Sequence, residues 1–234
     1  MIDPLSVFLL LLAAATPILF AALGELVVER AGVLNLGVEG MMITGALAGF
    51  AAAYVTGSPF AGFLAAALAG AAIAMLFAAL TQILLANQVA SGLALTLFGL
   101  GLAALFGKPL EGIKAPAMMP GPLRINWIVW LGLVMVPLVW WFLNRSRTGL
   151  ILRGVGENHD AAHALGYPVH AIRIAAIGFG GAMAGVGGPE ADAPFEEWLS
   201  GAAPALARAV VSALAVIDFE AVVIDGVLPR AWGG

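Results

Sequence analysis

The chain has 234 residues, of which 62% are hydrophobic and 10% charged, and its net charge is −4. A soluble domain carries about 25% charged residues, so a water-soluble fold of this length cannot bury so much apolar surface. The sequence predicts an integral membrane protein whose surroundings are the lipid bilayer. It contains no cysteine, which excludes disulfides and thiol catalysis. No basic stretch suits nucleic-acid binding.

Apolar runs that are long enough to cross a bilayer recur along the chain. A spanning helix needs roughly 20 mainly apolar residues; six runs come close to this, and a weaker seventh is interrupted by Pro204 and Arg208. We therefore predict an all-α polytopic bundle of about six or seven transmembrane spans with broken helices. The runs are residues 5–23, 35–55, 60–85, 89–106, 126–143, 172–188 and 199–217.

Basic residues between the fifth and sixth runs indicate the orientation. Cytoplasmic loops carry an excess of lysine and arginine, so this segment is expected on the cytoplasmic side. Alternating spans then place the N-terminus outside. The basic residues are Arg145, Arg147, Arg153 and Arg173.

The stretch between the first two runs holds carboxylates beside membrane-depth segments. Charge in such a place is costly and usually marks an interface or a pathway. Glu25 and Glu29 are four residues apart, as are neighbours on one helix face, and Arg30 is placed to neutralise one of them. We expect an interfacial charge cluster of Glu25, Glu29 and Arg30, with contact to a partner as the alternative.

Other polar residues lie in or beside the predicted spans, where buried polar groups usually have partners. Asn35 and Glu39 have two interpretations: side chains along a substrate path, or hydrogen bonds to the backbone of a broken helix. At the inner end of the fourth run, polar residues are expected either to gate the path or to cap a helix. These are Asn87, Gln88 and Ser91.

The segment before the sixth run carries the signals of a short helix. Glu157, Asn158 or Asp160 suits its first turn or cap, and Gly166 supplies a C-terminal stop with Pro168 just beyond. A short capped helix between two spans suits docking on a cytoplasmic partner. The alternative is an ordinary solvated loop with orienting arginines. The predicted helix runs through Ala161, Ala162 and Ala164.

Sites for chemistry are not predicted in this chain. His159 and His163 are spaced to share a helix face, but no carboxylate or cysteine completes a convincing metal site. The glycine-rich stretches lack the Gly-x-x-x-x-Gly-Lys-Ser/Thr pattern of a phosphate-binding loop. We therefore expect neither a metal nor an enzyme, and no ATP hydrolysis by the chain itself.

Motifs in a fixed order resemble a known family. Residues 24–42 and 87–96 are similar to the nucleoside and simple-sugar branch of the ABC importer permeases, and residues 180–185 match the helix that follows the coupling loop in these permeases. The segment from residue 153 to 166 resembles the coupling loop of the wider branched-chain amino acid, ribose and nucleoside superfamily. The resemblance covers about residues 5–187. Its coupling-loop pattern is Arg153-Gly154-Val155-Gly156-Glu157-Asn158, then Ala161-Ala162, then Gly166.

The resemblance implies a membrane-spanning subunit that works with partners. It predicts three partners: a cytoplasmic ATPase subunit, a second and related permease, and an extracytoplasmic substrate-binding lipoprotein. The ATPase subunit uses ATP and Mg, and this chain is expected to hold no cofactor. The expected location is the bacterial plasma (inner) membrane. It adds Thr96 to the candidate path. The residues expected to couple to the ATPase are Arg153, Gly154, Gly156, Glu157, Asn158, Ala161, Ala162 and Gly166.

Alternatives to a nucleoside or sugar importer stay open at this point. They are a branched-chain amino acid permease, a secondary transporter, a membrane enzyme acting on lipid, and a non-functional truncated copy. A secondary transporter would also use broken helices. The last arises because residues 188–234 hold seven of the fourteen acidic residues and depart from the family. We expect residues 1–187 to form the permease domain and residues 188–234 an atypical tail, altered in frame or truncated. The alternative is a divergent, short member of the family.

Overall fold

The structure, a computed structural model, describes residues 4–110, 113 and 126–188. These residues all belong to one compact unit, residues 1–194; the second unit, residues 195–234, lies outside the described residues. The predicted domain boundary after residue 187 stays a prediction.

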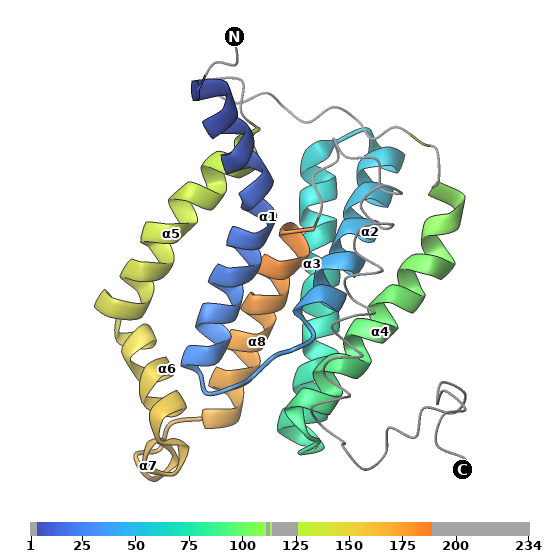
Figure 1. The fold of residues 1–234 in the computed structure, drawn as a ribbon. Helices are drawn as coiled ribbons and strands as arrows, with labels where there is room; N and C mark the ends of the chain where they lie inside the picture. The colour runs from blue at the N-terminus through green and yellow to red at the C-terminus, as the bar shows by residue number, and fades with distance from the viewer. Residues whose placement is uncertain (1–3, 111–112, 114–125, 189–234) are drawn as a thin grey trace, which may run out of the picture. The chain divides into compact units, whose positions relative to one another are not determined.

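The regular elements of the described residues are helices, as predicted (Figure 1). Six of them are long and apolar enough to cross a membrane: α1, α2, α3 with its continuation η1, α4 with η2, α5 and α8. This confirms the six predicted spans, while the seventh run lies outside the described residues. The bounds are α1 Pro4–Arg30, α2 Val38–Thr56, α3 Pro59–Ala78, the π-helix η1 Ala79–Ile83, α4 Gln88–Gly107, the 3-10 helix η2 Lys108–Leu110, α5 Trp127–Arg145, α6 Arg147–Glu157, α7 His159–Ala164 and α8 Val169–Val186.

Polar side chains fix where several helices begin. The Ser58 hydroxyl accepts a hydrogen bond from the Ala61 amide at 3.5 Å, just before Pro59 opens α3. The Ser146 hydroxyl accepts from the Gly149 amide at 2.9 Å at the start of α6. Each cap satisfies an amide that has no partner inside its helix.

Two predicted boundaries differ from the structure. Helix α1 continues to Arg30, so Glu25 and Glu29 lie in its last turns instead of a loop. The reason is that Val27 and Val28, both buried, extend the apolar packing of α1 past Glu25. Helix α2 begins at Val38 and not at residue 35. The break between the first two spans is therefore short, and we call residues 31–37 the α1–α2 connection.

Helix α8 packs against both α1 and α3 and lies between them (Figure 1). Glycines allow this close packing. A Cβ atom added at Gly70 of α3 would overlap the Gly181 carbonyl oxygen and lie 2.7 Å from the Cα atom of Gly185. In lipid, where helices gain little from burying apolar surface, such close backbone contact is a main source of helix association.

Replacing Gly70 with alanine is expected to lower the thermal unfolding midpoint of the purified protein by several degrees. The added methyl group meets backbone atoms that cannot rotate away, and overpacking of this kind costs about 1–3 kcal/mol. Gly101→Ala on α4 is the matched control, because no heavy atom lies within 4 Å of its added Cβ. Tryptophan fluorescence in detergent measures both midpoints. Equal midpoints would show that the α3–α8 contact is not tight.

Candidate functional site

The α1–α2 connection is held by side chains from distant parts of the chain. Gly32 turns the backbone with φ +77°, a conformation that favours glycine. The Leu34 amide donates to the Gln88 side-chain oxygen at 2.8 Å. The Thr96 hydroxyl donates to the Leu36 carbonyl oxygen at 3.3 Å. The first three turns of α4 thus bind the middle of the connection through Leu34 and Leu36.

Asn35 is the central residue of the connection and is only 3% exposed. Its backbone amide donates to Glu25 Oε1 at 3.2 Å, and its side-chain Nδ2 donates to Glu25 Oε2 at 3.5 Å. Its Oδ1 accepts from the Gly37 amide at 3.0 Å. The Asn35 side chain therefore satisfies the Gly37 backbone amide, and the Glu25 carboxylate satisfies the Asn35 backbone amide. These bonds favour the broken-helix interpretation of Asn35.

The charge cluster predicted at the end of α1 is arranged differently from the expectation. Glu25 is half-buried and bonds Asn35, whereas Glu29 and Arg30 are exposed. Among the described residues, Arg30 forms no ion pair with either carboxylate. The acid–base contact that the structure does show, between His159 and Asp160, lies on α7. The reason is geometric: Glu25 lies five residues before the end of α1, and its carboxylate bonds Asn35 of the connection.

The remaining path candidates lie close to the connection but differ in burial. Asn87 is exposed and caps α4, since its Oδ1 accepts from the Ala90 amide at 3.1 Å, which favours capping over gating. Ser91 is buried, at 8% exposure. Glu39 is exposed in the first turn of α2, where the positive end of the helix dipole stabilises its negative charge. It forms no hydrogen bond within the described part of the chain. The role of these residues in a substrate path stays a prediction.

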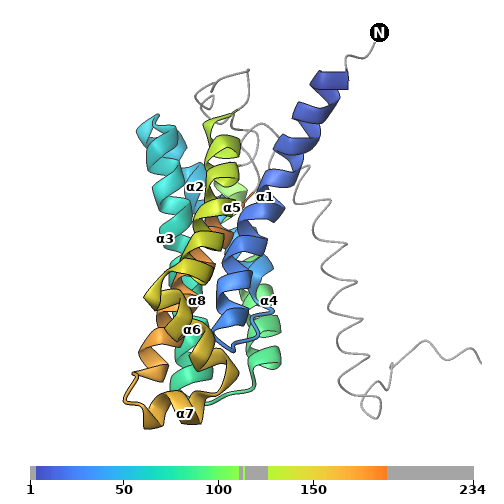
Figure 2. The same ribbon diagram turned by 90° about the vertical axis from the view of Figure 1, so that its left-hand side faces the viewer.

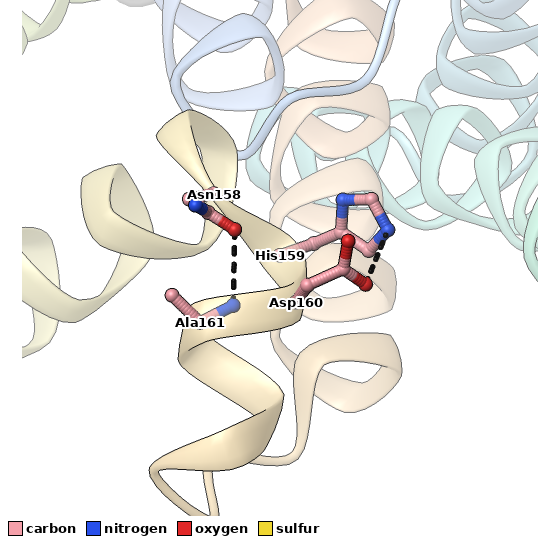
Figure 3. A network of polar contacts seen from close by, with 4 residues as sticks. All are labelled: Asn158, His159, Asp160 and Ala161. Atoms are coloured by element: carbon pink, nitrogen blue, oxygen red, sulfur yellow. Dashed lines mark hydrogen bonds and ion pairs between the residues drawn. The ribbon is translucent and has the colours of Figure 1, made fainter.

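Helix α7 is short, capped and exposed on most of its surface. Asn158 Oδ1 accepts from the Ala161 amide at 3.0 Å, so of the three predicted starts the structure selects Asn158 (Figure 3). Gly166 ends the turn with φ +85°. Ala162 is buried against Val155 of α6 and Val169 of α8, and this contact seats α7 on the bundle.

Exposed side chains cover the remainder of α7 and the residues after it. His159 Nε2 lies 3.2 Å from Asp160 Oδ1 on the solvent side (Figure 3). Leu165 is 77% exposed, and Tyr167 is also exposed. An apolar residue this exposed, beside a capped helix, gives a surface that can receive another protein.

The residues before α7 form a helix that the sequence did not predict. Arg153, Gly154, Gly156 and Glu157 lie on α6, which precedes the predicted short helix. The Ser146 cap starts this helix and the burial of Leu152 and Val155 holds it, which outweighs the low helix propensity of its glycines.

Helices α6 and α8, which flank α7 in the chain, both contact the end of α1 or the α1–α2 connection. Gly156 packs so closely on the end of α1 that an added Cβ would overlap the Arg30 carbonyl oxygen. Arg173 of α8 donates from Nε to the Ala31 carbonyl oxygen at 3.1 Å. Both views place α6 and α7 at the end of the bundle where α1 ends (Figures 1 and 2). These contacts join α6 and α8, which both pack on α7, to the end of α1 and the connection.

Arg173 is the site residue that sequence reasoning missed, since it was used only to orient the chain. The signal was present: it is a charged residue at the start of the sixth apolar run, and charge beside a membrane span usually has a specific partner.

Comparison with known proteins identifies the family. Residues 7–189 match the family described as the permease component of branched-chain amino acid transport systems. The chain belongs to this permease family. The match confirms the resemblance that the motifs predicted. No solved structure matches the chain significantly.

Three relatives show which branch of the permease family the chain resembles. TsgC13 of Haloferax volcanii, an ABC transporter permease protein provisionally named for glucose, is 42% identical over 80% of this chain and 63% of its own length. The nucleoside ABC transporter permease NupC of Lactococcus lactis is 30% identical over 76% of this chain and 64% of its own. The guanosine permease NupQ of Bacillus subtilis is 29% identical over the same shares. The chain spans less than two thirds of the length of these relatives.

Proposed function

We propose that this chain is the membrane-spanning permease subunit of an ATP-driven ABC importer and forms the path for a nucleoside or a simple sugar. Membership of the permease family supports the transporter class. The names of the three relatives support the substrate class, since one is named for glucose and two for nucleosides. Six helices suited to crossing a membrane supply the walls of the path.

The observation that carries this proposal is the attachment of the exposed helix α7 to the α1–α2 connection. In the proposed mechanism, a separate ATPase subunit binds ATP and Mg and receives α7 on its surface. Closure of the ATPases displaces α7, and α6 passes this displacement through Gly156 to the end of α1. The connection then shifts against Gln88 and Thr96 of α4, which changes the side of the membrane to which the path opens.

The proposed complex contains two permeases, two ATPases and an extracytoplasmic substrate-binding lipoprotein in a bacterial inner membrane. We propose a related second permease as the partner in the membrane, so that the pair is heteromeric. Arg145 and Arg147 are exposed at the turn from α5 to α6, in the segment that leads to α7. They support a cytoplasmic position for this segment by the positive-inside rule.

Uptake of labelled substrates tests the proposed function. Cells that express the full chain with its ATPase, second permease and binding protein are compared with cells lacking only this chain. We expect uptake of a labelled nucleoside or of labelled glucose to require the chain and cellular ATP. Uptake that requires the chain but follows the proton gradient after ATP is depleted would instead identify a secondary transporter.

Replacing Asn158 with alanine is expected to reduce this uptake severalfold. Loss of a helix cap costs about 1 kcal/mol, which is large for a six-residue helix that is marginal alone. Asn87→Ala removes the equivalent cap from α4, whose 20 residues are held by packing, and should retain most of the uptake. Hydrogen exchange should show faster exchange in α7 of Asn158→Ala. A larger loss in Asn87→Ala would contradict the proposed role of α7.

A further inference from the structure

An apolar groove runs along the bundle between α5 and α8, with α1 as its floor and α6 closing one end. Its volume is about 310 Å³. All the residues that line it are apolar except Thr148, and none is acidic. We call it the α5–α8 groove. Its lining includes Val27 of α1, Phe142 of α5, Leu152 of α6 and Ala175 of α8.

The groove ends at a cluster of positive charge. Its walls belong to spanning helices, and Phe142 and Thr148 place its closed end at the turn from α5 to α6. Arg145 and Arg147 flank this turn and are both exposed. The amide end of α6, which begins at Arg147, adds the positive end of a helix dipole.

We propose that the α5–α8 groove binds a phospholipid acyl chain and that Arg145 and Arg147 hold the anionic headgroup of the same lipid. Apolar walls at membrane depth match a hydrocarbon chain. Guanidinium groups pair with phosphate oxygens through two parallel hydrogen bonds. Basic pockets between membrane helices on the cytoplasmic side bind anionic headgroups for the same reason. The occupant is therefore an anionic bilayer lipid, and zwitterionic lipids bind more weakly.

Photolabelling tests the proposal on the full chain in nanodiscs. Phosphatidylglycerol with a diazirine in its acyl chain is compared with the phosphatidylcholine equivalent, and labelled residues are mapped by mass spectrometry. We expect phosphatidylglycerol to label groove residues preferentially. The Arg145→Gln/Arg147→Gln variant should lower this preference about thirtyfold, as expected when two arginines act near the membrane surface. Lys108→Gln, at the opposite end of the spans, is the charge control.

A second pair of variants tests the groove without changing charge. Ala175 is exposed and lines the groove, so Ala175→Phe should fill it and abolish labelling there. Ala104→Phe, at an exposed position on α4, should leave the labelling intact. Equal labelling by both lipids, or labelling that neither set of variants reduces, would overturn the proposal.

Residues 199–217 of the chain itself are the competing occupant of the groove, and cysteine cross-linking in the same nanodiscs tests for them. Because the sequence contains no cysteine, one cysteine at Ala175 and a second within residues 199–217 form the only thiol pair. We expect no cross-link between them. An efficient cross-link would mean that the groove holds this segment of the chain and would overturn the lipid proposal.

Discussion

Gly156→Ala is expected to lower ATP-dependent uptake at least about tenfold while the ATPase subunit continues to hydrolyse ATP. The added Cβ would overlap the Arg30 carbonyl oxygen and lie 2.9 Å from the Gly32 amide nitrogen. Both are backbone atoms, so α6 must move away from α1, at a cost of about 1–3 kcal/mol. The proposed mechanical connection between α7 and the α1–α2 connection is thereby loosened.

Gly154→Ala is the matched control because it lies two residues away on the same helix and is exposed, with no heavy atom within 4 Å of its added Cβ. It removes the same residue type and raises helix propensity by a similar amount. Uptake by Gly154→Ala should fall much less than uptake by Gly156→Ala. If the two variants behave alike, close contact between α6 and α1 has no part in coupling.

Asn35→Asp is the second change with a large expected effect. The aspartate retains an oxygen for the Gly37 amide, but its other oxygen replaces the amide group that donates to Glu25 Oε2. Two carboxylates then face one another in a half-buried site, where like charges repel strongly. We expect lower thermal stability and at least about a tenfold loss of uptake, since an unsatisfied buried group costs about 1–3 kcal/mol.

Glu25→Gln in the same chain is expected to restore much of the lost stability and uptake. The glutamine side chain carries both a donor and an acceptor. It can donate to the new carboxylate at position 35 and accept from the backbone amide of the same residue. Thermal unfolding and uptake of the two single variants and the double variant form a cycle that isolates the pairwise interaction. Strict additivity of the two single effects would show that Glu25 and Asn35 do not act together.

The spans were predictable because each depends on local sequence. Runs of about 20 apolar residues determine them whatever the partners are, and caps at Asn87 and Asn158 follow from side chains that accept a hydrogen bond three residues ahead. The positive φ of Gly166 likewise follows from its place after a short alanine-rich helix.

The site was only partly predictable because its contacts join distant residues. Leu34 and Gln88 are 54 residues apart, and Ala31 and Arg173 are 142 apart. Periodicity and spacing carry no information about such pairs. The sequence paired Glu25 with charged neighbours, whereas the fold turns it toward Asn35. Helix α6 was missed because its glycines and arginines are typical of a loop, and tertiary packing outweighs that local preference.

Cysteine cross-linking to the ATPase subunit tests most directly whether α7 is the docking surface. The chain has no native cysteine, so a cysteine at Leu165, which is 77% exposed beside α7, can be compared with one at Val55, which is 80% exposed at the far end of α2. We predict that position 165 cross-links to the ATPase and that ATP changes the yield, while position 55 does not react. Cross-linking at position 55, or none at position 165 in a complex that transports substrate, would contradict the proposed mechanism.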